Sequence, residues 1–311
     1  MASAEAAFEP RFLETRDGVR LRAGLWNAAE GIPFRGVCLV LQGHSEFLEK
    51  YFEVFDELRG RGFAVAAFDW RGQGGSARAL EDSRKAHIID FAQYAEDLRA
   101  FMDQIVRHMD DRPPFALAHS MGGHILLRNL HDHPGIIRAA AFSAPMLRVF
   151  TNPFPENLAI RIARWMVRFG RGNDYVFGAG KRDPIALPFA QNIVTSDPVR
   201  YARTIAHLEA DPSLCLAGPT WHWLSAAFAS MAITAEPGYA EAITAPVMIA
   251  TAGHDRVVRT EATIAFAQRM PHCFHGMVEG AEHEILMEQD HLRAKFWQAF
   301  DDFIARALPG T

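Results

Sequence analysis

The sequence has few cysteines, no long apolar run and no surplus of positive charge. Its three cysteines, Cys38, Cys215 and Cys273, are odd in number and far apart among 311 residues. We read them as reduced, buried small hydrophobic residues, not as a disulfide framework. None has the spacing of a metal site, and no histidine pair has ligand spacing with a third partner. We therefore expect neither a metal nor a cofactor.

The lack of long apolar runs limits where in the cell the protein can be located, and its net charge limits what it can bind. No run approaches the roughly 18 residues of a membrane span, and the first ten residues lack the basic start and apolar core of a signal peptide. We expect a cytoplasmic protein, with peripheral contact with the inner face of the membrane as an open alternative. The formal net charge of −5 argues against nucleic acid as a partner, because phosphate binding needs a basic surface. The oligomeric state is not predicted.

What the sequence does contain is an alternation of apolar runs with helical patterns. Residues 36–41 and 63–68 are continuous apolar runs, which are typical of central parallel strands. The alternation predicts an α/β protein with a mostly parallel central sheet and helices on both faces. It stops after residue 145 and resumes near residue 246. We therefore predict a core of residues 1–145 and 246–311, interrupted by a mainly helical inserted cap at residues 146–245.

The chain is organised around a serine at the end of an apolar run. Ala118-x-Ser120-x-Gly122 is followed at once by a helical pattern, which is the layout of a nucleophile elbow. Such a turn lifts the serine above the sheet edge, and the helix N-terminus offers N–H groups to a developing negative charge. The usual motif has glycine at the first position, where alanine adds only a methyl group. The alternative is an ordinary strand-to-helix turn with a serine N-cap.

A serine nucleophile needs a neighbouring base, and that base needs an orienting carboxylate. In a fold of this kind the chain order is Ser…Asp…His, with each residue at the carboxyl end of a strand. Ser120, Asp255 and His283 meet this condition and are the predicted catalytic residues. Taken singly, Asp255 could be a turn residue and His283 a surface loop histidine. Glu284 is a rival acid, although a chain neighbour rarely points at the ring of its own histidine.

The oxyanion hole should use two backbone N–H groups. One belongs to Met121, which follows the nucleophile, and the other to His44, in the loop after the strand at residues 36–41. Gly43 permits the turn that this loop needs. We expect the His44 imidazole to pack within the loop and His119 to pack beneath the elbow.

The predicted cap contains a cationic amphipathic helix. Large apolar residues recur at helical spacing at Leu158, Ile162, Trp165 and Phe169. Another face of the same helix carries Arg161, Arg164 and Arg168. This combination suits a membrane surface or an anionic lipid head group, and the alternative is a helix with its apolar side on the substrate pocket and its arginines in water. Both interpretations favour an apolar acyl pocket. The candidate substrate-binding residues of the cap are Trp165, Phe169, Trp221 and Trp223.

Five segments together resemble the α/β-hydrolase family, in its group of lysophospholipases and monoacylglycerol lipases. They are residues 42–46 (Gln-Gly-His-Ser-Glu), 69–76, 119–123, 253–255 and 280–286. The resemblance implies a serine ester hydrolase that forms an acyl-enzyme and acts on a small-molecule ester or lipid, either a lysophospholipid or a monoacylglycerol. The family usually has histidine where this chain has Gln42 and glycine where it has Ala118.

Two other functions stay open. A small-ester carboxylesterase or a serine aminopeptidase could use the same fold. The peptidase would need an acidic residue in the cap to hold the substrate ammonium, and five are available: Glu156, Asp174, Asp183, Glu209 and Asp211. A non-catalytic binder on a hydrolase scaffold would typically have lost one of the three catalytic residues, and none is missing here.

Overall fold

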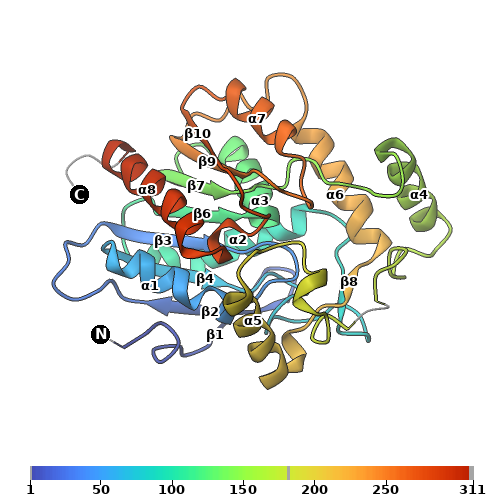
Figure 1. Ribbon diagram of the computed structural model, residues 1–311, viewed down its shortest axis with the longest axis horizontal. Helices are drawn as coiled ribbons and strands as arrows, with labels where there is room; N and C mark the ends of the chain where they lie inside the picture. Colours follow the sequence, from blue (N-terminus) through green and yellow to red (C-terminus); the bar gives the residue numbers. More distant parts are fainter. Residues whose placement is uncertain (1, 181–182, 308–311) are drawn as a thin grey trace.

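The computed structural model describes residues 2–180 and 183–307. Its centre is an eight-stranded sheet (Figure 1) in the order β1-β2-β4-β3-β6-β7-β9-β10. The strands are β1 (Arg11–Glu14), β2 (Arg20–Trp26), β3 (Gly36–Leu41), β4 (Phe63–Phe68), β6 (Phe115–His119), β7 (Ala139–Ser143), β9 (Val247–Ala252) and β10 (Cys273–Val278). The β1–β2 and β2–β4 pairs are antiparallel, and every pair from β4 to β10 is parallel. The predicted mostly parallel sheet is confirmed.

The central strands are continuous apolar runs because both of their faces are covered. Every residue of β3, β4, β6 and β7 is buried. In the middle of the sheet, Cys38 on β3 pairs with Val65 on β4 and Phe115 on β6. On the α8 side, the ring of Phe115 lies 5.5 Å from that of Phe300. Because both faces are covered, apolar and polar residues do not alternate along these strands.

Helices cover both faces of the sheet, as predicted. In Figure 1, α1 (Phe52–Gly60) and α8 (Asp290–Ala307) lie on the near side, and α2 (Ala92–Gln104) and α3 (Ser120–Asp132) lie on the far side. A further helix, α7 (Thr260–Arg269), packs against β9 and β10. The short 3₁₀ turns are η1 (Leu48–Tyr51), η2 (Val106–His108), η3 (Phe189–Gln191), η4 (Pro212–Leu214) and η5 (Ile285–Met287).

The chain between β7 and β9 gives the large sheet no strand among the described residues. It contains α4 (Glu156–Arg168), α5 (Pro198–Ala210) and α6 (Trp221–Thr234), and α4 packs against α6 beside the sheet (Figure 1). Its strand β8 (Gly218–Pro219) pairs with β5 (Lys85–Ala86), which follows β4 in the chain. The division into a core and a cap at residues 146–245 stays a prediction.

The turn from β6 into α3 is tight. Ser120 has φ of +48°, a left-handed conformation that is uncommon outside glycine. Close packing also demands Gly122, because a Cβ atom there would lie 2.4 Å from the Leu41 carbonyl oxygen. The strained serine is therefore held at the end of β6, directly beside the end of β3.

Candidate active site

Three side chains from three loops meet above the carboxyl ends of the strands. The Nε2 atom of His283 lies 2.9 Å from Ser120 Oγ, and its Nδ1 atom lies 2.7 Å from Asp255 Oδ2. Ser120 follows β6, Asp255 follows β9 and His283 follows β10. The side chains of Asp255 and His283 are only 0% and 5% exposed. The structure therefore brings together the three residues selected from the sequence.

Asp255 has one carboxylate oxygen for its own turn and one for the histidine. Its Oδ1 atom accepts the N–H groups of Val257 and Val258, each at 2.8 Å. This leaves Oδ2 to accept the Nδ1–H of His283, which places the imidazole lone pair on Nε2. That lone pair faces the hydroxyl of Ser120, so the arrangement can remove the hydroxyl proton.

In the loop after β3, one backbone N–H without a hydrogen-bond acceptor in the described part of the chain lies between two that donate hydrogen bonds. The Gly43 N–H donates to the Glu46 carboxylate, and the Ser45 N–H donates to Gln73 Oε1 at 3.0 Å. The His44 N–H between them has no acceptor among the described residues, and the same holds for the Met121 N–H in the first turn of α3.

Steric packing fixes this loop against the elbow. A Cβ atom on Gly43 would lie 3.0 Å from the His119 ring and 3.1 Å from Ser120 Cβ. The Gln42 carbonyl accepts the Trp70 indole N–H at 2.9 Å. The side-chain amide of Gln42 is buried without a hydrogen-bond partner among the described residues. The departure at Gln42 thus leaves the backbone of the loop packed on the nucleophile turn.

Asp69, at the start of the segment 69–76, supports the loop from behind. Its carboxylate accepts the N–H groups of Leu48 at 3.0 Å and Gly75 at 2.8 Å and pairs with Arg22 at 2.6 Å. Burial raises the pKa of Asp69 to about 6, against the opposing effect of Arg22. These contacts are those of a structural support.

The two other histidines of the site lie where packing was expected. His119 Nδ1 lies 3.0 Å from the Ser143 carbonyl, and its ring lies 4.8 Å from that of His283. The ring of His44 lies 4.3 Å from that of Trp223. Burial lowers the pKa of His119 and of His44 to about 4. Both rings are therefore neutral at pH 7.

A buried ionic cluster beside the site was missed from the sequence. Lys50 Nζ lies 2.7 Å from Glu46 Oε1 and 2.6 Å from Glu284 Oε1, and Tyr51 donates its hydroxyl to Glu46 at 2.7 Å. Burial would raise the pKa of Glu46, but Lys50 outweighs it and holds the pKa at about 2. Burial keeps the pKa of Glu284 above its usual range. The i,i+4 spacing of Glu46 and Lys50 was the one signal in the sequence.

An apolar cavity of about 460 Å³ lies between α4, α6 and the segment after β7. Trp221 lines it, whereas Trp223 packs on the loop after β3 and donates its indole N–H to Tyr94 at 3.1 Å. The prediction that Trp165 and Phe169 face the pocket is wrong for this structure. These two side chains are 66% and 75% exposed, and neither lines the cavity.

The packing of α4 explains this difference. Ala159 and Ala163 are its two buried residues, and small side chains let the helix approach α6 closely. The face toward the neighbour therefore centres on these alanines and on Ile162. The stripe through Leu158, Trp165 and Phe169 falls on the flank of that face, where α4 meets solvent.

The described ranges 2–180 and 183–307 contain neither a metal-binding cluster nor a membrane-spanning helix. No group of three or more histidine, cysteine or acidic side chains there could hold a metal ion. No helix in the same ranges combines the length and the apolar character needed to cross a membrane.

Comparison with known proteins places the chain in a family. Residues 32–290 match the family described as serine aminopeptidase, S33. The chain belongs to this family. It is 34% identical over 279 residues to lysophospholipase L2 of Escherichia coli (strain K12), which covers 87% of the chain and 80% of the relative. A monoacylglycerol lipase of Mycolicibacterium smegmatis is 28% identical over 143 residues, 46% of the chain and 49% of the relative.

Solved structures agree with the fold. A soluble variant of monoglyceride lipase from Saccharomyces cerevisiae superposes with a TM-score of 0.78 at 21% identity, covering 97% of this chain and 96% of that one. A carboxyl esterase from Bacillus coagulans gives a TM-score of 0.76 at 20% identity, with coverage of 97% and 99%. The predicted α/β-hydrolase fold and the resemblance to the lysophospholipase and monoacylglycerol lipase group are confirmed. The protein is a serine hydrolase of this fold.

Proposed function

We propose that the protein hydrolyses lysophospholipids or monoacylglycerols through an acyl-enzyme on Ser120. The observation that carries the proposal is the hydrogen-bonded series from Ser120 through His283 to Asp255. The backbone N–H groups of His44 and Met121, beside this triad, have no hydrogen-bond partner among the described residues. The names of the relatives, lysophospholipase and monoacylglycerol lipase, support the choice of lipid esters.

The reaction follows from the positions of these atoms. His283 Nε2 takes the hydroxyl proton as Ser120 Oγ attacks the ester carbonyl carbon, and Asp255 stabilises the imidazolium that forms. The carbonyl oxygen becomes an oxyanion, which the N–H groups of His44 and Met121 bind. The C–O bond then breaks, His283 donates its proton to the leaving alcohol, and the acyl group stays on Ser120. A water molecule, deprotonated by His283, then attacks the acyl carbon. The bond to Ser120 Oγ breaks, His283 returns the proton to Oγ, and the carboxylic acid leaves.

The cavity beside the cap helices suits the acyl chain. Its volume lies within the range of about 300–1,000 Å³ of small-molecule sites. One wall adjoins the aspartate turn, because Val149 pairs with Val258, whose N–H donates to Asp255. Another wall is Trp221, two residues before the tryptophan that packs on His44. The cavity therefore adjoins the turn that holds Asp255, although none of the three catalytic residues lines it.

The aminopeptidase alternative lacks an acidic residue in this cavity. In the cap, Glu156 pairs with Arg148 and Asp174 pairs with Arg171. None of the five acidic residues named above lines the cavity. A substrate ammonium would therefore meet no carboxylate there, which favours an ester with an apolar acyl group.

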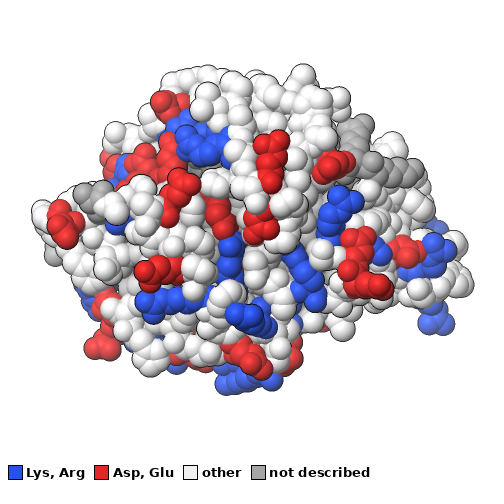
Figure 2. Space-filling model, turned by 90° about the horizontal axis from the view of Figure 1, so that it is seen from below, with Lys and Arg blue, Asp and Glu red and all other residues white. Residues whose placement is uncertain are grey.

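We also propose that the outer face of α4 rests on an anionic lipid surface. On the face shown in Figure 2, basic and acidic side chains are interspersed. Arg161, Arg164 and Arg168 differ, because they are exposed and have no ion pair with a described residue. Trp165 and Phe169 are exposed beside them, and this pairing of arginine with aromatic residues is typical of helices that lie in a membrane interface.

The function is tested with a substrate panel. The parent and Ser120→Ala are compared on p-nitrophenyl esters of rising chain length, lysophosphatidylcholine, monoacylglycerol and aminoacyl-anilides. We expect hydrolysis of the lipid esters and labelling of Ser120 by a fluorophosphonate, because only a base-activated serine reacts readily. Folded parent protein that takes no label, or labelling that survives Ser120→Ala, would refute the mechanism. Preference for the anilides would show a peptidase.

A further inference from the structure

The loop that carries His283 is fixed through the peptide groups on both sides of it. The N–H of Glu282 donates to Glu288 Oε1 at 2.8 Å. The N–H of Glu284 donates to the carbonyl of Val194 at 2.7 Å. Val194 belongs to the segment inserted between β7 and β9, so the cap itself contacts the histidine loop.

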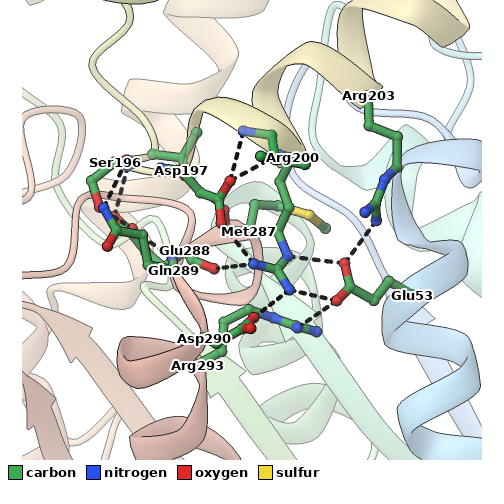
Figure 3. A network of polar contacts seen from close by, with 12 residues as sticks. Glu53, Ser196, Asp197, Arg200, Arg203, Met287, Glu288, Gln289, Asp290 and Arg293 are labelled. Atoms are coloured by element: carbon green, nitrogen blue, oxygen red, sulfur yellow. Dashed lines mark hydrogen bonds and ion pairs between the residues drawn. The ribbon is translucent and has the colours of Figure 1, made fainter.

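The Glu288 carboxylate accepts hydrogen bonds from the histidine loop and from the cap (Figure 3). Its side chain is wholly buried. Besides Glu282, it accepts the Ser196 N–H at 3.1 Å, the Ser196 hydroxyl, and the Gln289 N–H at 3.2 Å. None of these donors is a basic side chain. A buried carboxylate that is satisfied by four directed hydrogen bonds has little freedom to move.

Arg200, in the first turn of α5, makes a second link at the same place (Figure 3). Its guanidinium donates to the Glu288 carbonyl at 3.0 Å, to Asp197 at 2.7 Å and to Asp290 at 2.7 Å. It also pairs with Glu53 of α1 at 2.6 Å. The start of α5 is thereby joined to α1 and to the chain that leads into α8, so the cap segment at residues 194–200 is fixed to the core.

We propose that Glu288 is a positioning residue for His283 and that Ser196 of the cap acts with it. This inference rests on the proposed function, in which His283 is the general base. Through the Glu282 N–H, Glu288 holds the histidine loop at the position where Nε2 lies 2.9 Å from Ser120 Oγ. The cap is then more than a wall of the substrate cavity, because it supplies part of the geometry of the base.

Weakening the contact between Ser196 and Glu288 should lower turnover without changing substrate binding. Neither Ser196 nor Glu288 lines the apolar cavity, so weakening their contact should leave KM within about two-fold. Displacement of a catalytic group by about 1 Å can cost on the order of 100-fold in rate. We therefore expect kcat to fall. A role in stability alone would lower the fraction of folded protein and leave kcat per intact site unchanged.

The experiment compares Ser196→Ala, Ser196→Thr and Glu288→Gln with the parent. Active sites are counted by fluorophosphonate labelling to completion, and kcat and KM are measured on p-nitrophenyl butyrate. We expect kcat per site to fall about 100-fold in Glu288→Gln and about 10-fold in Ser196→Ala. Ser196→Thr keeps the hydroxyl and should recover most of the loss. Ser213→Ala is the matched control, because the hydroxyl of this exposed cap serine bonds only the neighbouring Asp211.

The outcomes distinguish this inference from the proposed function. A parent without Ser120-dependent hydrolysis would remove the proposed function. An active parent whose Ser196→Ala and Glu288→Gln variants keep the parental kcat per site would overturn the positioning role alone. If Glu288→Gln does not fold, the two serine variants decide. The low-field proton resonance of the hydrogen bond between His283 and Asp255 should also shift in Ser196→Ala, and an unchanged resonance would contradict the proposal.

Discussion

The carboxylate of Glu284 lies 2.6 Å from the ammonium of Lys50, although Glu284 follows His283 directly in the chain. The ring of His283 instead faces Asp255, at 2.7 Å. Lys50 also binds Glu46, whose carboxylate accepts the Gly43 N–H. Glu284, the rival acid, is thereby held beside the oxyanion loop (residues 42–46, after β3), where its carboxylate pairs with a buried lysine.

Asp255→Asn should therefore lower kcat on p-nitrophenyl butyrate by about 10⁴-fold with the fold intact. The amide would hold the imidazole in the wrong tautomer, as it does in the serine protease triad. Glu284→Gln should cost far less, because it changes only a contact with Lys50. Near-normal turnover of Asp255→Asn, together with collapse in Glu284→Gln, would show that the acid was assigned wrongly.

A methyl group at Gly43 should impair the oxyanion loop without unfolding the protein. The added Cβ atom would lie 2.8 Å from Glu46 Oε2 and 3.1 Å from Ser120 Cβ, so the loop would have to shift. Because one oxyanion donor is worth about 10²–10³ in rate, we expect Gly43→Ala to lower kcat by about 100-fold. The matched control is Gly60→Ala at the end of α1, where a Cβ atom meets nothing within 4 Å. Equal rates for both variants would argue against a steric role of Gly43.

The stability contribution of Glu53 should depend on pH. Burial would raise its pKa, but hydrogen bonds and charges from Arg200, Arg293 and Arg203 outweigh it and hold the pKa at about 2. A carboxyl group whose pKa is lowered by folding stabilises the protein above its unfolded pKa of 4.5. That contribution is lost as the pH falls from 4.5 toward 2.

Glu53→Gln tests this dependence in urea unfolding at several pH values. We expect the variant to be less stable by about 1–2 kcal/mol at pH 7, the size of a charged hydrogen bond discounted for solvent exposure. The difference from the parent should shrink as the pH approaches 2. Glu9→Gln, at an exposed residue, is the control and should stay within about 0.5 kcal/mol. A difference that is constant with pH would mean that the charge of Glu53 does not stabilise the fold.

The sequence was most informative where burial on both faces permits only one kind of secondary structure. The strands β3 and β4 could be predicted because covering both faces forces a continuous apolar run. The edge strand β10 has no continuous apolar run of this kind, because four of its six residues are exposed. The elbow and the residues after the strands carried a local signal as well.

Contacts between distant segments could not be predicted in the same way. Lys50 and Glu284 are 234 residues apart, and Glu288 meets Ser196 across 92 residues. No local pattern encodes either pair. The orientation of α4 also escaped prediction, because the close approach of Ala159 and Ala163 to α6 decides which flank is covered.

We expect the exposed arginines of α4 to hold the protein on anionic membranes. Each basic residue near an anionic membrane is worth about 1 kcal/mol. Changing Arg161, Arg164 and Arg168 together to glutamate should therefore release the protein from anionic vesicles and slow the hydrolysis of lysophospholipid in them. Turnover of p-nitrophenyl butyrate should change little, since none of the three residues touches Ser120, His283 or Asp255. Binding is measured by sedimentation with anionic and with neutral vesicles.

Salt and a charge-matched variant show whether any loss of activity comes from lost membrane binding through α4. Raising the salt concentration should imitate the triple substitution in the parent, because exposed charges act over only about 8 Å at physiological ionic strength. The control changes three arginines away from α4 to glutamate, namely Arg11, Arg16 and Arg107, and so has the same net charge. If the control loses vesicle binding equally, net charge and not the α4 face governs it. Equal losses on the lipid and on the butyrate ester would mean that α4 only supports the structure of the cap.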